Sequence, residues 1–158
     1  MRHLAIITIL LLVLAAVVSS TTYYIVDAKH GRSIVAGDHY DGHIYHQDPR
    51  DRPNAKWLLI PVRWQPGYYF IRDTKHWRYI VAGNRYDGRL YHQEAHNRPN
   101  AKWRLKPFGD KIGSTTFELW DQKHNRAIVA GDRADNRVYH QYPNHRPNAR
   151  WALIPNHA

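Results

Sequence analysis

The chain has 158 residues, a size that suits one domain once any leader is removed. It contains no cysteine, which excludes disulfide cross-links, thiol catalysis and cysteine-ligated zinc. The formal net charge is +10, and lysines and arginines are spread along the whole sequence. This distribution favours a basic folded surface and anionic partners over a disordered basic tail.

The N-terminal segment has the pattern of a secretory signal peptide. Arg2 precedes an apolar run over residues 4–18, which is followed by two small residues, Ser19 and Ser20. The run has the length of a signal-peptide hydrophobic region and is short for a membrane-spanning helix. We therefore expect residues 1–20 to be a signal peptide, the protein to be secreted and residues 21–158 to form the folded domain. A retained membrane anchor is the alternative.

Beyond this segment, one sequence unit occurs three times. An Ile-Val-Ala-Gly block, a Tyr-His-Gln triplet and an Arg-Pro-Asn-Ala-x-Trp block recur in the same order. Ile34, Ile80 and Ile128 begin the first block, so the units are offset by 46 and then 48 residues. The repeats cover about residues 23–61, 69–107 and 117–155. Such self-similarity predicts a repeat architecture, in which a site would exist in up to three copies.

Each unit has the period-two hydrophobicity of β-strands and no helical period. In the first segment, Tyr23 and Ile25 share an apolar face while the intervening positions vary between units. The fourth segment places Trp57 and Leu59 on one face and ends at a proline. The second and third segments are predicted to form a β-hairpin. The turn signals of the three hairpins are Asp41-Gly42, Asp87-Gly88 and Asp135-Asn136.

Four short strands per unit, repeated three times, can close in few ways. A propeller usually needs at least four blades, and a solenoid needs capped ends that this sequence does not show. We therefore predict an all-β fold: a β-trefoil of three internal four-stranded repeats with pseudo-threefold symmetry. The repeated Trp57, Trp103 and Trp151 would line the shared core. A three-sheet prism is the main structural alternative.

On these motifs the chain resembles the ricin-B-like β-trefoil lectins. The units of that family end in a Gln-x-Trp signature with an asparagine just before the glutamine. Asn54 and Trp57 match the asparagine and the tryptophan, whereas Ala55 replaces the glutamine, and the other two units repeat this pattern. Ala36 lies where the family has its sugar-orienting aspartate, and Asp38 follows two residues later.

The chain also resembles the mussel-type galactose-binding trefoils, whose third strand leads into a His-x-Asp segment. His46-Gln47-Asp48 fits that segment, while the second unit has Glu94 and the third has Tyr142 in place of the aspartate. Both resemblances imply a β-trefoil fold and carbohydrate binding, although a fold alone does not establish a function.

Four positions in each unit are candidate carbohydrate-binding residues. Sugar sites combine an aromatic or imidazole face with a few fixed donors and acceptors. The His and Gln of the triplet, the Asp or Asn after Ala-Gly and the Asn before Trp supply these groups. The candidates are Asp38, His46, Gln47 and Asn54 in the first unit, Asn84, His92, Gln93 and Asn100 in the second, and Asp132, His140, Gln141 and Asn148 in the third.

Each candidate type also has a purely structural interpretation. Strand alternation places His46 on the apolar face of its strand, where it would point inward and bond a loop carbonyl. Asn54 follows a proline and would form a turn that bonds its own backbone. Asp38 precedes the hairpin and would be a turn residue. The repeated Lys-His pairs, such as Lys29-His30, would be solvated turn residues or a set of anion contacts.

We predict a non-catalytic lectin with no cofactor and no metal. No nucleophile, base and orienting group occur together at one unique place, because every unit repeats the same chemistry. Three equivalent histidines around the axis could bind zinc, but the sequence offers no supporting partner. The third unit, with Ala134 for Tyr and Asn136 for Gly, is the one expected to be impaired.

The expected partners are glycans, either galactose-type or acidic, with no nucleic acid and with membranes bound only through surface glycans or charge. The alternative is a basic adhesion or matrix protein that binds sulfated polymers or acidic membranes. Salt separates the two, because exposed charge contacts are screened over about 8 Å at physiological ionic strength. A protein-binding trefoil, such as an inhibitor, would carry its function in one variable loop, and the similarity of the units argues against it.

Overall fold

The computed structural model describes residues 21–37, 42–48, 51–83, 88–108, 115–131 and 136–156. The first unit contains β1 (Thr22–Asp27), β2 (Ser33–Ala36), β3 (Ile44–Gln47), the 3-10 helix η1 (Pro53–Ala55) and β4 (Trp57–Pro61). The second contains β5 (Tyr68–Asp73), β6 (Tyr79–Ala82), β7 (Leu90–Gln93), η2 (Pro99–Ala101) and β8 (Trp103–Pro107). The third contains β9 (Thr116–Asp121), β10 (Ala127–Ala130), β11 (Val138–Gln141), η3 (Pro147–Ala149) and β12 (Trp151–Asn156).

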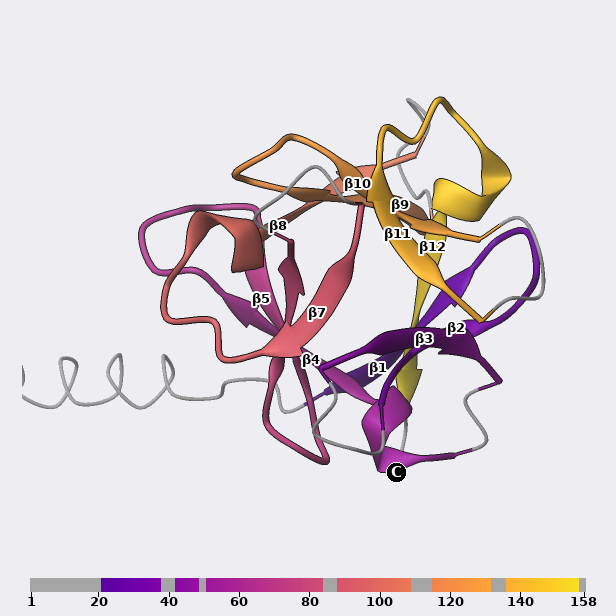
Figure 1. Ribbon diagram of the computed structural model, residues 1–158, viewed down its shortest axis with the longest axis horizontal. Coiled ribbons are helices and arrows are strands. Elements are labelled where there is room, and N and C mark those ends of the chain that lie inside the picture. The colour runs from indigo at the N-terminus through magenta and orange to yellow at the C-terminus, as the bar shows by residue number, and fades with distance from the viewer. Residues whose placement is uncertain are drawn as a thin grey trace, which may run out of the picture.

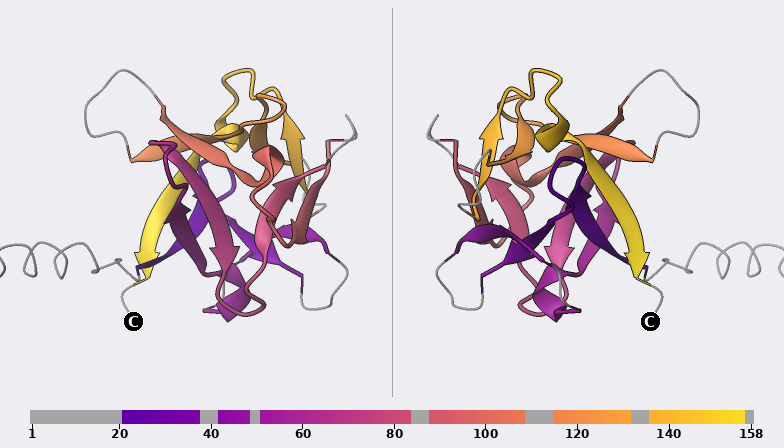
Figure 2. Two further views of the ribbon diagram at one scale, coloured as in Figure 1. Left: turned by 90° about the vertical axis from the view of Figure 1, so that its left-hand side faces the viewer. Right: turned by 90° about the vertical axis from the view of Figure 1, so that its right-hand side faces the viewer.

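The first and fourth strands of the three units close into a barrel. β1 pairs with β4, β4 with β5, β5 with β8, β8 with β9, and β9 with β12, all antiparallel. β12 returns to β1, so the ends of the described chain pair along the whole of β1, from Thr22 to Asp27 (Figure 2). Closure removes the exposed sheet edge that an open array of the same strands would leave.

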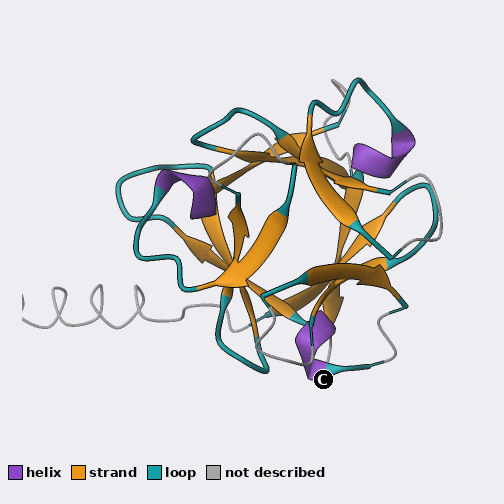
Figure 3. Cartoon of the chain, in the orientation of Figure 1, coloured by secondary structure: helices purple, strands orange, loops and turns teal. Residues whose placement is uncertain are grey.

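Three hairpins, β2–β3, β6–β7 and β10–β11, cover one end of this barrel. Viewed down the shortest axis, β3, β7 and β11 lie around a common centre, with the 3-10 helices outside them (Figures 1 and 3). Each hairpin tip accepts a backbone hydrogen bond from the third strand of another unit. These bonds run from His46 N–H to Asn136 O, from His92 N–H to Gly42 O and from His140 N–H to Gly88 O, at 3.0, 2.8 and 2.8 Å.

The hairpin tips have the left-handed backbone that their sequence predicts. Gly42, Gly88 and Asn136 have φ values of 71°, 70° and 59°. Glycine adopts this region without strain, and asparagine does so more easily than most residues. The predicted turn partners at 41, 87 and 135 lie outside the described residues, as do the predicted leader and residues 38–40, 84–86 and 132–134.

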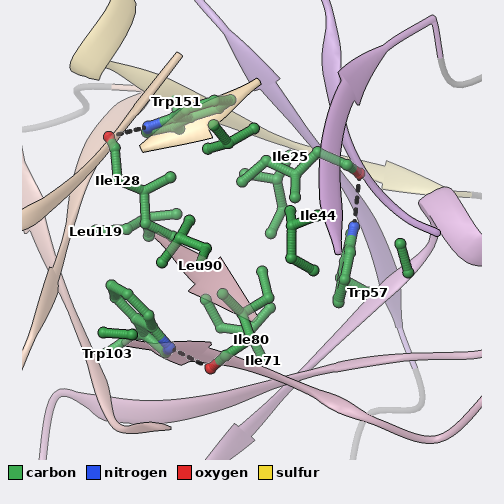
Figure 4. Packing of buried hydrophobic residues seen from close by; sticks show 14 of the residues in the cluster. Ile25, Ile44, Trp57, Ile71, Ile80, Leu90, Trp103, Leu119, Ile128 and Trp151 are labelled. Carbon is green, nitrogen blue, oxygen red and sulfur yellow. Dashed lines mark hydrogen bonds between the residues drawn. The ribbon is translucent and has the colours of Figure 1, made fainter. Parts of the chain in front are cut away.

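The core lies between barrel and cap and repeats three times. Trp57, Trp103 and Trp151 are fully buried, and isoleucines and leucines of all three units fill the space between them (Figure 4). Each indole N–H donates a 2.8 Å hydrogen bond to a carbonyl of its own unit's second strand. The acceptors are the carbonyl oxygens of Ile34, Ile80 and Ile128. This is the predicted β-trefoil, with the predicted tryptophans at its centre.

Within the described segments, no helix has the length and apolar character required to cross a bilayer.

Replacing Trp103 by alanine is expected to lower the free energy of unfolding by about 3–5 kcal/mol, because a fully buried indole leaves a cavity that its neighbours fill only in part. Urea unfolding followed by circular dichroism measures the change. Trp64→Ala is the matched control, since Trp64 is 84% exposed. Equal losses in both variants would contradict the assigned core.

Candidate functional site

The first strand of each unit ends at a buried aspartate that organises the following turn. Asp27 accepts hydrogen bonds from the backbone N–H groups of Lys29 and His30 at 2.9 and 2.7 Å, and of Arg32 at 3.1 Å. His30 Nδ1 lies 3.1 Å from the same carboxylate. Asp73 and Asp121 accept the corresponding backbone bonds in the other units. The repeated Lys-His pairs therefore belong to turns built around a carboxylate.

The histidine of each Tyr-His-Gln triplet completes this arrangement from the third strand. His46 Nε2 donates to Asp27 Oδ2 across 2.6 Å, and His92 Nε2 donates to Asp73 Oδ2 across the same distance. His140 binds Asp121 in the same way. The sequence-based alternative of an inward histidine is correct, but the expected partner, a loop carbonyl, is wrong. The partner is a carboxylate 19 residues earlier, which strand pairing brings across the hairpin.

Each of these imidazoles also packs edge-on against a core tryptophan from another unit. The His46 and Trp151 ring centroids lie 6.2 Å apart with an interplanar angle of 83°. The other two pairs have nearly the same geometry: His92 with Trp57 and His140 with Trp103. The imidazole therefore connects its own turn to the neighbouring unit's part of the core.

The hydrogen bonds keep the aspartates ionised in spite of their burial. Burial alone raises the pKa of Asp27, but the hydrogen bond from His46 and the backbone N–H groups of His30 and Arg32 outweigh it. The pKa of Asp27 falls from 3.8 to about 2. The pKa values of Asp73 and Asp121 are lowered by the same balance of burial against hydrogen bonds, with His92 and His140 as the main donors.

The asparagine before each tryptophan is also an interior residue. Asn54 Nδ2 donates a 2.6 Å hydrogen bond to the carbonyl of Ala36, which fixes η1 against the end of β2. Asn100 and Asn148 bond Ala82 and Ala130 with the same length. Each side chain thus makes a hydrogen bond of longer range than the expected local turn, because the 3-10 helix packs on the second strand of its unit.

These contacts change the assignment of the predicted site residues. The three histidines and three asparagines are at most 2% exposed, so in this structure their side chains contact the scaffold and do not reach the surface. The glutamines of the triplets, on the opposite face of the strand, do reach it. Asp38, Asn84 and Asp132 lie outside the described residues, so their part in sugar binding stays a prediction. The six buried candidates are His46, His92, His140, Asn54, Asn100 and Asn148.

The same buried groups have side chains of the kinds that ligate metals. In each unit an aspartate and two histidines, such as Asp27, His30 and His46, place one ligand atom each within 4.8 Å of the others. In the first unit both imidazoles already bond the carboxylate, which also accepts three backbone N–H bonds. A metal ion would have to displace these bonds, so the arrangement is explained by the turn that it holds.

The surface next to this network carries a polar cleft of about 220 Å³ in the first unit. Arg32 enters it from the turn after Asp27, and Gln47 and Asp48 enter it from the end of β3. Arg52, just before η1, and Asn136, at the tip of the third unit's hairpin, complete the lining. Two guanidinium groups, one carboxylate and two amides can together bind hydroxyl and anionic groups of a ligand.

Sequence reasoning named Gln47 as a candidate and matched Asp48 to a His-x-Asp segment, but it missed the role of the other three residues. Arg32 and Arg52 could have been found, because an arginine recurs at both positions in every unit. Asn136 could not, since it reaches the cleft from the third unit through the hairpin contact with His46. The corresponding positions are Arg78, Gln93, Glu94, Arg98 and Gly42 for the second unit, and Arg126, Gln141, Tyr142, Arg146 and Gly88 for the third.

No protein-family model matches the chain, and no curated protein sequence matches it. Solved structures do. A designed threefold-symmetric protein, ThreeFoil, is 18% identical, with a TM-score of 0.74 over 84% of this chain and 97% of that chain. The BEL β-trefoil is 9% identical, with a TM-score of 0.75 over 87% of this chain and 94% of that one. A lectin from Polyporus squamosus is 16% identical, with a TM-score of 0.71 over 84% and 48%.

Other similar structures include an exo-β-1,3-galactanase from Clostridium thermocellum and the cytolethal distending toxin of Haemophilus ducreyi. At these low identities, the comparisons establish that the protein is a β-trefoil. The resemblance to trefoil lectins is confirmed at that level, and the same fold also occurs in an enzyme and a toxin.

The low pKa of Asp27 predicts a loss of stability in acid. A carboxylate whose folded pKa lies below its unfolded value contributes stability that is complete above the unfolded pKa and is lost as pH falls through the folded one. For Asp27 that window runs from 3.8 down to about 2, and Asp73 and Asp121 add to it. Chemical unfolding at a series of pH values should show the free energy of unfolding falling in this window. An unchanged stability at pH 2 would contradict the predicted pH dependence.

Removing His46 is expected to destabilise the fold strongly. His46→Ala removes the shortest hydrogen bond to the buried Asp27 carboxylate, and removing one partner of a buried charge typically costs about 3–5 kcal/mol. Thermal and urea unfolding measure the loss. His43→Ala, on the exposed residue three positions earlier, should change stability by less than about 1 kcal/mol. Equal stability of the two variants would contradict the structural role assigned to His46.

Proposed function

We propose that the protein is a secreted lectin that binds carbohydrate without converting it. The observation that carries this proposal is the cleft of Arg32, Gln47, Asp48, Arg52 and Asn136. All five lining residues have hydrogen-bonding side chains. The buried Asp27–His46 pair supports two of them, since Asp27 bonds the backbone N–H of Arg32 and His46 is next to Gln47 in β3. A polar cleft on a rigid support suits a ligand rich in hydroxyl groups.

The composition of the cleft favours a sugar with an anionic substituent over a neutral one. Arg32 and Arg52 outnumber the single carboxylate of Asp48, and a guanidinium binds carboxylate and sulfate groups through paired hydrogen bonds. Gln47 and Asn136 supply both donors and acceptors for hydroxyl groups. Acidic glycans are therefore the preferred ligand class, with galactose-type sugars as the neutral alternative.

Up to three sites are proposed, one for each unit, although their linings differ. Both arginines and the glutamine recur in all units, while the acidic position is Asp48, Glu94 or Tyr142. The hairpin residue that reaches each cleft is asparagine for the first unit and glycine for the other two. The first site therefore has the most polar groups. Several weak sites on one rigid body would gain avidity on a multivalent glycan surface.

The competing function is charge-driven adhesion to sulfated polymers or acidic membranes. The net charge of +10 favours it. Binding through charge alone, however, does not explain why two amide side chains, Gln47 and Asn136, line the cleft. The two functions differ in their dependence on salt. Binding that relies on hydroxyl contacts survives higher ionic strength, whereas binding through exposed charges is screened.

A catalytic function has less support, although the trefoil fold also occurs in an enzyme. Each unit contains the same aspartate and histidine, and both side chains face the interior. The pair holds a turn and offers no nucleophile beside a surface ligand.

A glycan array probed at roughly 0.05 M and 0.5 M salt tests this proposal, with bound glycans expected to persist at the higher salt. Arg52→Ala should weaken binding to acidic glycans about tenfold, because a lost charged hydrogen bond costs about 1.5–3 kcal/mol. Arg63→Ala, on an exposed arginine outside the cleft, is the control. Absence of any glycan binding, or complete loss of binding at high salt, would contradict the proposed lectin.

A further inference from the structure

The second unit carries a cluster of side chains that the other two units lack. Arg72 near the end of β5, Trp77 in the following turn and Tyr79 at the start of β6 lie close together. The corresponding residues are Val26, Gly31 and Ser33 in the first unit, and Trp120, Asn125 and Ala127 in the third. The scaffold therefore does not require this cluster, because two of three copies fold without it.

Trp77 has a backbone conformation that is unfavourable for a bulky residue. Its φ is 60°, in the left-handed region, where Gly31 and Asn125 have φ values of 67° and 53°. Glycine and asparagine tolerate this region, whereas a large aromatic residue there is an outlier. Burial of the indole does not compensate, since Trp77 is 57% exposed. A strained and exposed tryptophan is the kind of outlier from which a function can be inferred.

The cluster is stacked on a rigid support. The Arg72 guanidinium lies over the Trp77 ring, 4.6 Å from its centroid, and over the Tyr79 ring at 6.0 Å. Phe70 contacts Tyr79 edge-on, with centroids 5.8 Å apart. Phe70 and Tyr79 in turn pack against a small buried group formed by Val81, Ala95 and Ala101. The exposed indole is therefore held in place from beneath and needs little ordering on binding.

Arg72 brings an incompletely satisfied positive charge to this platform. Its Nε is buried and has no hydrogen-bond partner among the described residues. The aromatic faces of Trp77 and Tyr79 attract the guanidinium cation, but they do not replace a hydrogen-bond acceptor. Because Nε itself is shielded from ligand, an anionic group would bind the Nη atoms of the half-buried Arg72 guanidinium.

We propose that Arg72, Trp77 and Tyr79 form one additional binding site, unique to the second unit, for an acidic pyranose. The indole would stack on the apolar face of the sugar ring, and the guanidinium would bind the ring's carboxylate or sulfate. The inference rests on the proposed function for its class of ligand only. It involves no residue of the polar clefts, so it breaks the threefold equivalence of the sites.

Titration calorimetry with three tetrasaccharides tests the site on the full chain. Hyaluronan carries carboxylates only, chondroitin 4-sulfate carries carboxylates and sulfates, and chitotetraose is neutral. At least one acidic tetrasaccharide should bind about tenfold more tightly than chitotetraose, as expected for a charged hydrogen bond. Comparison of the two acidic ligands shows whether the site takes a carboxylate or needs a sulfate. Equal affinity for the neutral ligand, or no binding of any, overturns the proposal.

Two substitutions copied from the other units isolate the residues. Trp77→Asn introduces the residue of the third unit and relieves the backbone strain, so the melting temperature should stay the same or rise. The Kd for the acidic ligand should nevertheless increase about tenfold. Arg72→Val, copied from the first unit, should remove the preference for acidic over neutral ligand. An unchanged Kd in Trp77→Asn overturns the proposal.

Trp64→Asn is the matched control. Trp64 is also exposed, has a φ of 63° and lies beside a stacked arginine, Arg63, but it lies in the loop between β4 and β5. Its substitution should leave the Kd unchanged, and an equal loss in Trp64→Asn overturns the proposal. Arg52→Ala separates this site from the clefts: if it abolishes acidic binding while Trp77→Asn has no effect, the inference fails and the proposed function stands.

Discussion

The hydrogen bond between a buried aspartate and a buried histidine is the interaction on which the rest of each unit depends. Asp27 fixes the turn between β1 and β2 through backbone N–H groups, and His46 joins that turn to β3. The imidazole then packs on Trp151 of another unit. One hydrogen-bonded pair thus connects a turn, a hairpin and the common core. Because a buried charge without a partner is costly, neither member can change alone.

Comparison of the three units distinguishes the buried scaffold from the surface positions that vary. Residues that are identical in all units, such as the aspartate, the histidine and the core tryptophan, face inward and hold the fold. Residues that differ between units, such as Asp48 and its counterparts or Trp77 and its counterparts, lie at the surface. Buried residues that are identical in all units therefore indicate structural constraint, whereas Arg32, Gln47 and Arg52 are also identical and line the cleft. The differences between units indicate where a ligand would distinguish one unit from another.

Closure of the cap explains why a surface cleft belongs to two units at once. Each hairpin tip bonds the third strand of another unit, so a residue at the tip lies beside that unit's triplet. Asn136, which departs from the glycine of the other tips, faces the first unit's cleft for this reason. A substitution at the hairpin tip of one repeat therefore changes the cleft of another repeat. A repeat is not a self-contained binding module.

The sequence by itself determined the strands, the hairpin turns, the threefold unit and the core tryptophans, because period-two hydrophobicity and turn chemistry are local properties. It also placed His46 on the inward face. Only the tertiary structure decided what His46 and Asn54 bind, since Asp27 and Ala36 lie 19 and 18 residues away from them and meet them through strand pairing. The cleft and the Arg72–Trp77 stack were decided in the same way, because both depend on distances that folding sets between units, strands and turns.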